Sequence, residues 1–224
     1  MNTFDWYYLL LTFPYTLFGP RIPSIWISYG AKCIPILYLI WTIIKNKSWT
    51  KRFDYSTKIA AGLVASVIGD VYILNMEEIS KSYMINGIIF FALAHIFYIS
   101  AMKVKNFRYF HLLIVVMLFS LAYIIIHHQL IRMNYWQQIT IPAYILIILT
   151  MAYRASLHRD SVHIWNHIPA TRMAAISFVI SDSILGLTEI TGLIMIPKYV
   201  RHVLILSFYY FSQYCFTKSA ILHI

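Results

Sequence analysis

Long apolar runs separated by short polar connections repeat along the whole chain. An α-helix needs about 20 mostly apolar residues to cross the hydrocarbon core of a bilayer. Eight runs that carry almost no charge approach this length: Trp6–Phe18, Ile22–Ile44, Lys58–Met76, Tyr83–Met102, Phe110–Ile126, Trp136–Tyr153, Arg172–Thr188 and Val200–Leu222. Pro14 interrupts the first of them, which is also the shortest. The pattern predicts an all-α, polytopic membrane protein in which residues 1–224 form a single domain, a bundle of eight transmembrane helices.

The composition of the chain supports this class. Of its residues, 60% are hydrophobic and 12% are charged, which is far from the usual balance of a soluble domain. We expect no cleavable signal peptide, because Asp5 rather than a basic region precedes the first apolar run and no small-residue cleavage site follows it. Cys33 and Cys215 both fall inside predicted spans, so neither a disulfide framework nor a zinc site is expected from them.

The basic residues predict how the helices are oriented. A net charge of +10 would suggest nucleic-acid binding in a soluble protein, but here Lys and Arg lie between the apolar runs, where membrane orientation and anionic headgroups account for them. We therefore expect membrane lipids and no nucleic acid as partners. On the side of the termini lie Lys45, Lys47, Lys51, Arg52, Lys58, Lys103, Lys105, Arg108, Arg154, Arg159, Arg172 and Lys218. On the other side lie Arg21, Lys81, Arg132, Lys198 and Arg201. The excess of basic residues predicts that both termini are cytosolic.

Two aspartates inside predicted spans are the first candidates for chemistry. Asp70 lies about twelve residues into the third run and Asp182 about ten into the seventh, so at 1.5 Å per residue both reach the middle of the membrane. A carboxylate there is disfavoured by about 2.5–3.5 kcal/mol on insertion scales, and such residues usually serve binding, proton transfer or catalysis. The alternative is structural: Asp70 could form a buried ion pair with Lys32 of the second run.

Further polar side chains lie at the same depth. They come from the second, fourth and eighth runs and are Lys32, His95, Tyr209, Tyr210 and Gln213. His95 and Tyr98 share a helix face at a spacing of three, as do Tyr210 and Gln213. Gly69 and Ser181 directly precede the aspartates and allow neighbouring helices to approach closely. Each of these residues also has a structural interpretation, His95 as a hydrogen-bonded packing residue and the others as links between helices.

Other kinds of site lack their residues in this sequence. There is no His-x-x-x-His pair at the depth of the aspartates, and His127 and His128 lie at a predicted helix end, so we expect no metal site. The Gly-x-Ser-x-Gly turn of a serine hydrolase is missing as well. A pair of acids that works without a cofactor is the chemistry that remains.

Six short motifs follow one another along nearly the whole chain: Lys32-Cys33-Ile34-Pro35, Gly62-Leu63 with Gly69-Asp70, Ala94-His95-Ile96-Phe97-Tyr98, Tyr153-Arg154-Ala155, Phe178-Val179-Ile180-Ser181-Asp182, and Tyr209-Tyr210 with Gln213-Tyr214. In this order they resemble the motifs of a known family, the YhhN-like integral-membrane lysoplasmalogenases of the transmembrane protein 86 type. One departure is Tyr153, which stands where the family pattern has a tryptophan before Arg154.

The resemblance implies eight helices and a hydrolase. The implied reaction cleaves the vinyl ether of a lysoplasmalogen, a lysophospholipid, to a fatty aldehyde and a glycerophospho-ethanolamine or -choline. The catalytic pair of aspartates of the family falls on Asp70 and Asp182. As in glycoside hydrolysis, we expect one acid to be protonated near neutral pH and to donate its proton, while its ionised partner orients water. Which aspartate plays which role stays open at this point.

The supporting residues are expected to position water, the leaving oxygen or the phosphate of the lipid. They are Lys32, His95, Tyr98, Arg154, Ser181, Arg201, Tyr209, Tyr210 and Gln213. Lys32 would adjust the charge of the ionised aspartate. Either Arg201 or Arg154 would hold the phosphate through bidentate contacts, depending on the side from which the lipid enters.

Two other functions remain open from the sequence. A proton-coupled transporter of an amphipathic or anionic solute could use the same acids as a proton relay. A structural or assembly factor would tolerate the loss of both aspartates. The Lys-Cys-x-Pro pattern at residues 32–35 favours the endoplasmic reticulum as the location. The sequence makes no prediction about oligomeric state, headgroup preference or chain-length preference.

Overall fold

The computed structural model of the chain describes residues 3–22, 24–46, 54–103, 108–158, 162–165 and 168–222. Within these ranges there are eight α-helices: α1 (Thr3–Phe18), α2 (Ile25–Asn46), α3 (Tyr55–Glu78), α4 (Met84–Ala101), α5 (Tyr109–Leu130), α6 (Tyr135–Leu157), α7 (Ala170–Leu185) and α8 (Lys198–Leu222). Between them lie the short helices η1 (Gly19–Arg21) and η2 (Lys81–Tyr83), the antiparallel strands β1 (His163–Trp165) and β2 (Ile168–Pro169), and a π-helical turn, η3 (Gly186–Ile190), that continues α7. Every predicted run coincides with one of these helices to within a few residues, so the all-α prediction is confirmed.

Six of the helices, α2 to α7, are long and apolar enough to cross a membrane. The prediction of a multi-pass membrane protein is therefore confirmed for these six. Two of the predicted spans do not meet the same criterion, although both segments are helical. The helix α1 has only 16 residues. The helix α8 is longer but carries buried polar side chains such as Gln213, Thr217 and Ser219, which make hydrogen bonds inside the protein instead of facing lipid.

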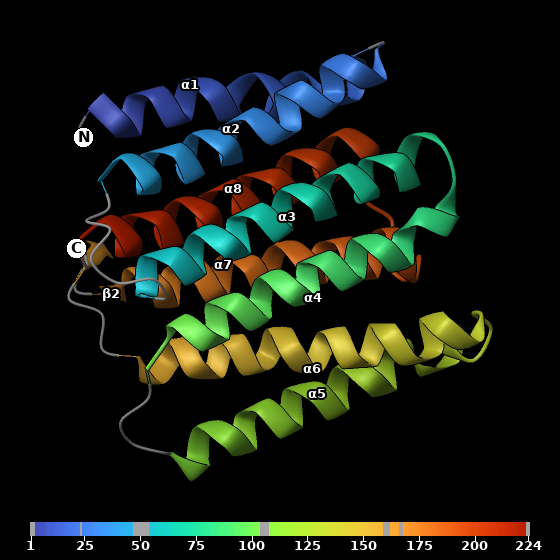
Figure 1. Cartoon of the computed structure of the whole chain (residues 1–224). Coiled ribbons are helices and arrows are strands. Elements are labelled where there is room, and N and C mark those ends of the chain that lie inside the picture. Colours follow the sequence, from blue (N-terminus) through green and yellow to red (C-terminus); the bar gives the residue numbers. More distant parts are fainter. Residues whose placement is uncertain are drawn as a thin grey trace.

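The helices run alternately up and down the structure. Figure 1 shows both termini at one end, together with the last turns of α2, α4 and α6 and with β2. The first turns of α2, α4, α6 and α8 lie at the opposite end (Figure 1). The termini thus share one side, as the sequence predicted. Five of the basic residues used for that prediction lie outside the described residues: Lys47, Lys51, Arg52, Lys105 and Arg159.

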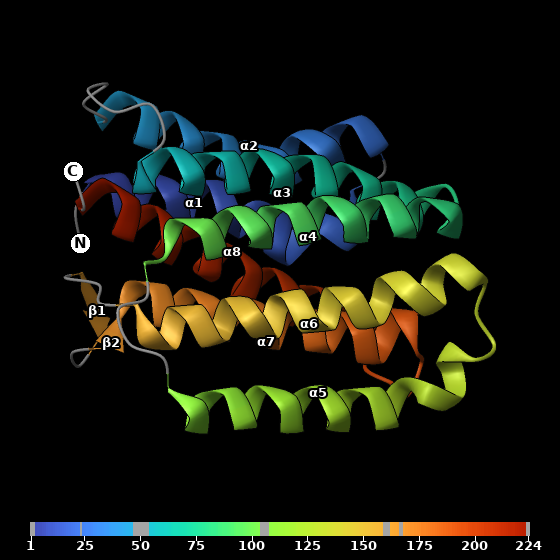
Figure 2. The same cartoon turned by 60° about the horizontal axis from the view of Figure 1, so that its bottom comes forward.

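The helices α8 and α5 occupy contrasting positions. The helix α8 packs against α1, α2, α3 and α7, and ten of its residues are buried. The helix α5 packs mainly against α6 and stands at the edge of the structure (Figure 2). Most of its apolar side chains are exposed, which suits a helix that faces lipid. The polar helix is thus inside and the most apolar one outside.

Glycines allow α3 and α4 to approach closely. A Cβ atom on Gly62 would lie 2.2 Å from Cε1 of Tyr98, and a Cβ on Gly69 would lie 2.9 Å from Cδ2 of Phe91. Only a residue without a side chain leaves room for these rings. The predicted role of Gly69 as a close-contact residue is confirmed, and the contact holds Asp70, the next residue, near α4.

Candidate functional site

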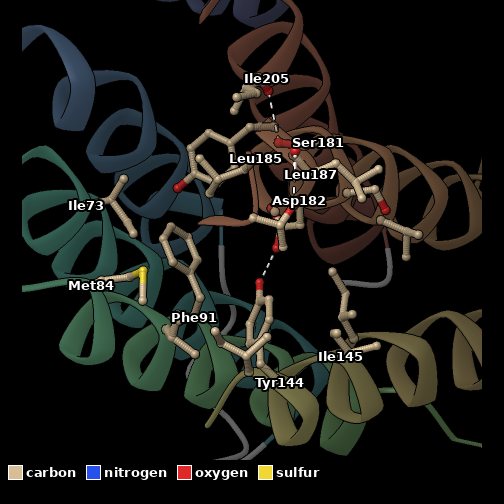
Figure 3. A pocket seen from close by; sticks show the side chains of 18 of the residues that line it. Ile73, Met84, Phe91, Tyr144, Ile145, Ser181, Asp182, Leu185, Leu187 and Ile205 are labelled. Atoms are coloured by element: carbon tan, nitrogen blue, oxygen red, sulfur yellow. Dashed lines mark hydrogen bonds between the residues drawn. The ribbon is translucent and has the colours of Figure 1, made fainter. Parts of the chain in front are cut away.

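A cavity of about 530 Å³ is lined mainly by the second halves of α3, α5 and α7, the first halves of α4 and α8, and the middle of α6. Within the described residues, all eight helices contribute to its lining, and most of the lining side chains are apolar. The residues that line it include Asp70 and Asp182. Figure 3 shows Asp182 of α7 facing Tyr144 of α6, with the apolar side chains of Ile73, Phe91 and Ile145 around them. The two acids therefore open into the same apolar space.

Asp70 is held by a lysine and a tyrosine. Its Oδ1 atom lies 3.6 Å from Nζ of Lys32, and its Oδ2 atom accepts a hydrogen bond of 2.5 Å from the hydroxyl of Tyr209. The side chains of Lys32 and Asp70 are only 6% and 3% exposed. A buried ion pair of this kind is weak evidence for stability but strongly disfavours the loss of one partner. The structural alternative for Asp70, a pair with Lys32, is thus present in the cavity itself.

Asp182 is held by a tyrosine and a histidine. The hydroxyl of Tyr144 donates a hydrogen bond to its Oδ2 atom. The Nε2 atom of His95 lies 3.0 Å from the same hydroxyl and 3.9 Å from Oδ2 of Asp182. The His95 ring is fully buried and packs edge-on against Phe178 at a centroid distance of 4.5 Å. His95, Tyr144 and Asp182 form a connected polar group, which we call the Asp182 triad.

Aromatic rings lie between the two carboxyl clusters. Phe178 packs edge-on against both His95 and Tyr209, at centroid distances of 4.5 and 5.5 Å. Phe91 packs edge-on against Phe178 and Tyr209 as well. The Tyr209 hydroxyl reaches Asp70, so this aromatic layer connects the surroundings of one acid to those of the other. The same packing holds two rings in place, that of Tyr209, which bonds Asp70, and that of His95, which lies beside Asp182.

Six of the eleven predicted site residues line the cavity, namely Lys32, Asp70, Ser181, Asp182, Arg201 and Tyr209. Ser181 donates a hydrogen bond of 3.0 Å to the carbonyl oxygen of Ile205 and so joins α7 to α8. The other five predicted residues lie outside the lining: His95, Tyr98, Arg154, Tyr210 and Gln213.

The five residues outside the lining support the helices in different ways. Tyr98 donates to Oε1 of Gln213 at 2.8 Å, which joins α4 to α8. Tyr210 donates to the backbone carbonyl of Lys32 at 2.9 Å, behind the ion pair with Asp70. His95 acts through Tyr144. Tyr98, Tyr210 and Gln213 are therefore links between helices, the structural interpretation that their sequence positions also allowed.

The two candidate arginines lie at opposite ends of the structure. Arg154, in the last turn of α6, donates to the backbone carbonyl of Met102 at 2.8 Å, near the end of α4. Arg201, in the first turn of α8, lines the cavity together with Lys198 and His202. Nε2 of His202 lies 3.0 Å from the backbone carbonyl of Tyr15. The cationic side of the cavity is thus the end away from the termini.

Tyr144, which contacts both His95 and Asp182, is not among the site residues predicted from the sequence. It lies in the middle of the sixth predicted run, about nine residues in, and that depth was the one available signal. The chain has 18 tyrosines, many of them at helix ends, so depth alone did not distinguish this one. Lys198 and His202, in the first turns of α8, were also missed because helix-end basic residues are usually interfacial.

Metal ligands do not come together in the part of the chain that the structure describes. No three His, Cys, Asp or Glu side chains there are placed to hold an ion. The polar groups of the cavity include two carboxyls, two tyrosine hydroxyls that donate to them, Lys32 beside Asp70, and further cations at one end. Such a set can donate a proton, stabilise a developing cation and bind an anion.

Comparisons with known proteins give a consistent result. The model of the YhhN family matches residues 27–220 of the chain. The chain is similar to a protein of Bos taurus named lysoplasmalogenase TMEM86A, with 26% identity over 211 residues that cover 92% of this chain and 83% of the bovine one. A protein of the same name from Homo sapiens is 25% identical over 211 residues, with the same coverage. No solved structure matches the chain.

Proposed function

The chain belongs to the YhhN family, and we propose that it is a lysoplasmalogenase, which hydrolyses the vinyl ether bond of a lysoplasmalogen. The products would be a fatty aldehyde and a glycerophospho-ethanolamine or -choline. Two relatives that carry the name lysoplasmalogenase support this proposal. The structural observation that carries it is that Asp70 and Asp182, more than a hundred positions apart, line one mostly apolar cavity.

The proposed reaction uses both acids in turn and needs no other reactant than water. One aspartic acid transfers its proton to the outer carbon of the vinyl ether, which is the alkene carbon that is not bonded to oxygen. An oxocarbenium ion forms as a result. Water attacks the carbon bonded to oxygen and loses a proton to the second, ionised aspartate. The resulting hemiacetal then collapses. Its hydroxyl proton returns to the first aspartate as the C=O bond forms, and the second gives its proton to the leaving glycerol oxygen. Both acids end in their starting states.

The surroundings of the acids suit an oxocarbenium transition state. Charge that develops in a water-poor cavity is stabilised by fixed groups more strongly than it would be in water. The carboxylate of the second aspartate supplies the opposite charge, as in glycoside hydrolases. Hydrogen bonds from Tyr144 and Tyr209 keep the two carboxyls in place, so little reorganisation accompanies the reaction.

The shape and charge of the cavity match a single-chain lysophospholipid. A volume of about 530 Å³ falls within the range of roughly 300–1,000 Å³ that is usual for small-molecule sites. The apolar walls from α4, α5 and α6 would take the alkenyl chain. Lys198 and Arg201 at the other side would take the phosphate, for which arginine offers bidentate contacts. We propose Arg201 rather than Arg154 as the phosphate ligand for this reason.

The proposed arrangement in the membrane follows the basic residues. We propose that α1 and α8 cross the bilayer with the other six helices and that both termini face the cytosol. The phosphate end of the cavity then lies toward the opposite face. An endoplasmic reticulum location would make that face lumenal. The cavity lining from α5, a helix that is almost entirely exposed, gives the site direct contact with the lipid phase.

The test is release of long-chain aldehyde from an alkenyl-lysophosphoethanolamine by the purified chain in nanodiscs. Activity is expected in the natural chain, and Asp70→Asn and Asp182→Asn are expected to lower it by about 10²–10⁴-fold, the usual effect of losing an acid or base. Asp54→Asn is the matched control. Asp54 caps α3 through the backbone N–H of Thr57 at 2.8 Å, outside the cavity, and Asn caps a helix equally well.

Full activity in both cavity variants would refute the aspartate mechanism. Absence of aldehyde from the natural chain, with uptake of labelled solute into proteoliposomes under a proton gradient, would identify a transporter instead. If neither activity is detected and both cavity variants support normal cell growth, a structural role is the better description.

A further inference from the structure

The two acids of the cavity have different partners. Both oxygens of Asp70 are engaged, Oδ1 near the ammonium of Lys32 and Oδ2 by the hydroxyl of Tyr209. Its side chain is only 3% exposed. An ammonium group near one oxygen and a hydrogen-bond donor on the other suit a carboxylate, which can only accept. Asp70 has the surroundings of the ionised partner in the proposed reaction.

The two oxygens of Asp182 differ in their hydrogen bonds. Its Oδ2 accepts from Tyr144, but Oδ1 has no hydrogen-bond partner among the residues that the structure describes. The side chain is 16% exposed, five times the fraction of Asp70, and it lines the cavity. The Oδ1 atom can therefore carry a proton and present it to a bound lipid. The position next to the lipid is the one that an acid requires.

Tyr144 determines how the Asp182 carboxyl is turned. Its hydroxyl group contacts Oδ2 of Asp182 and lies 3.0 Å from Nε2 of His95. A His95 ring with its proton on Nε2 would donate to the Tyr144 oxygen, and the Tyr144 hydroxyl hydrogen then points to Asp182. The Nδ1 atom of His95 has no partner within the described part of the chain, which fits a bare acceptor better than a buried N–H. The hydrogen bonds of the Asp182 triad thus run in one direction, from His95 through Tyr144 to Oδ2 of Asp182.

We propose that Asp182 is the acid that protonates the vinyl ether, that Asp70 is the ionised partner, and that Tyr144 is a positioning residue that keeps Oδ1 of Asp182 toward the lipid. This assignment rests on the proposed function. The proton leaves Oδ1 of Asp182 for the outer alkene carbon, and water gives a proton to Asp70. When the hemiacetal collapses, Asp70 protonates the glycerol oxygen and Asp182 recovers the hydroxyl proton. No further acid or base is needed.

A purely structural role for Tyr144 is the competing interpretation. Its hydroxyl also joins α6 to α7, and the loss of such a link would lower stability without changing which acid donates. The two interpretations differ in binding. A cationic analogue of the oxocarbenium ion should depend on the ionised aspartate alone, whereas a neutral analogue should depend on neither.

The first experiment uses two unreactive lysolipids and the full chain in nanodiscs. One lipid is a saturated alkyl ether, and the other carries a protonated amine in place of the reacting carbon. Asp70→Asn is expected to weaken binding of the amine by at least about tenfold, because a buried charge pair is lost. Asp182→Asn is expected to change it by less than about threefold, because one neutral group replaces another. Both variants should bind the alkyl ether like the natural chain.

A second pair of variants guards against misfolding of the first. Asp70→Asn leaves Lys32 buried without its partner, so Lys32→Met combined with Asp70→Asn removes both charges together. This double variant should lose amine binding and keep alkyl-ether binding. The reverse pattern, with amine binding lost in Asp182→Asn and kept in the double variant, would overturn the assignment.

Steady-state kinetics test Tyr144 itself. Tyr144→Phe should lower kcat by about 10–100-fold through misplacement of the acid, with KM and alkyl-ether affinity little changed. Tyr123→Phe is the matched control: Tyr123 lies on α5 outside the cavity lining, its ring is 5.5 Å from that of His127, and its hydroxyl makes no hydrogen bond to an acid among the described residues. A normal kcat in Tyr144→Phe would refute its role. A natural chain that releases no aldehyde would refute the proposed function instead, whatever the binding results.

Discussion

Nζ of Lys32 lies 3.6 Å from Oδ1 of Asp70, which joins α2 to α3 through an ion pair that is almost fully shielded from solvent. The hydroxyl of Tyr209 closes the other side of the carboxylate, and the hydroxyl of Tyr210 binds the backbone of Lys32. Three helices therefore converge on one charge. The predictions below use this and other contacts of the cavity.

Lys32→Met is expected to destabilise the protein by about 3–5 kcal/mol, because it leaves the Asp70 carboxylate buried without a cation. Adding Asp70→Asn to Lys32→Met should restore much of the loss, since no unpaired charge then remains. Thermal unfolding of the detergent-solubilised chain measures both effects. Equal unfolding temperatures for the single and the double variant would show that the ion pair does not couple the two residues.

Arg201→Gln is expected to raise KM for a lysophospholipid by about tenfold while kcat stays nearly constant. The reason is that a contact to the phosphate stabilises the bound substrate and the transition state to the same extent. The matched variant is Arg154→Gln, which removes the hydrogen bond to Met102 at the other end of the structure and should alter stability rather than KM. Initial rates against substrate concentration separate the two. A KM that rises only in Arg154→Gln would move the phosphate site to the end that carries the termini.

Gly62→Ala is expected to destabilise the helix pair α3 and α4 by about 1–3 kcal/mol, the usual effect of overpacking. The added Cβ would lie 2.2 Å from the Tyr98 ring, which itself is held by Gln213. Gly30→Ala on α2 is the control, since its Cβ would meet only Cδ1 of Ile34 at 3.8 Å, and there alanine should be neutral or stabilising. Chemical denaturation would measure both differences.

Ala122→Phe on α5 is expected to shift the preferred substrate toward shorter alkenyl chains. Ala122 lines the cavity, and a larger side chain there removes volume on the side assigned to the lipid chain. Leu113→Phe, on an exposed part of the same helix, should leave the preference unchanged. Competition between substrates of two chain lengths reports the ratio of their kcat/KM values. An unchanged ratio in Ala122→Phe would show that the alkenyl chain of the substrate does not bind beside Ala122.

Thiol labelling checks the orientation in the membrane. Cys33 and Cys215 are buried, so they should contribute little background. A cysteine at exposed Ser82, in η2, is expected to react only from the face opposite the termini, and one at exposed Lys45, near the end of α2, only from the cytosolic face. An impermeant reagent added to intact and opened vesicles distinguishes them. Labelling of both positions from one face would contradict the arrangement of the helices.

The sequence predicted the helices well because a bilayer demands long apolar runs, and the constant rise per residue placed both acids at a common level, where the structure has them lining one cavity. It did not predict the rotation of each helix. Tyr209 and Tyr210 are neighbours on α8, yet Tyr209 lines the cavity and Tyr210 donates to the backbone of Lys32 outside the lining. Depth also identified Asp182 but not its partner Tyr144, since that contact depends on how α6 and α7 pack.

Two of the eight predicted spans are helices whose ability to cross the membrane is not confirmed, and the physical reasons differ. The helix α1 has only 16 residues. The helix α8 is enclosed by protein, and its Gln213, Thr217 and Ser219 side chains make hydrogen bonds to neighbouring helices or to its own backbone. The choice between Arg154 and Arg201 likewise required the structure, since both are basic residues near helix ends.

The inner position of α8 has a consequence for biogenesis. This helix follows the other seven and supplies Tyr209, Arg201 and the carbonyl that Ser181 binds. A partly translated chain that lacks α8 therefore has an incomplete cavity, in which Asp70 has no hydrogen bond from Tyr209 and the cationic end has neither Lys198 nor Arg201. The last of the eight helices to be synthesised thus closes the cavity and ties α7 to the rest of the bundle.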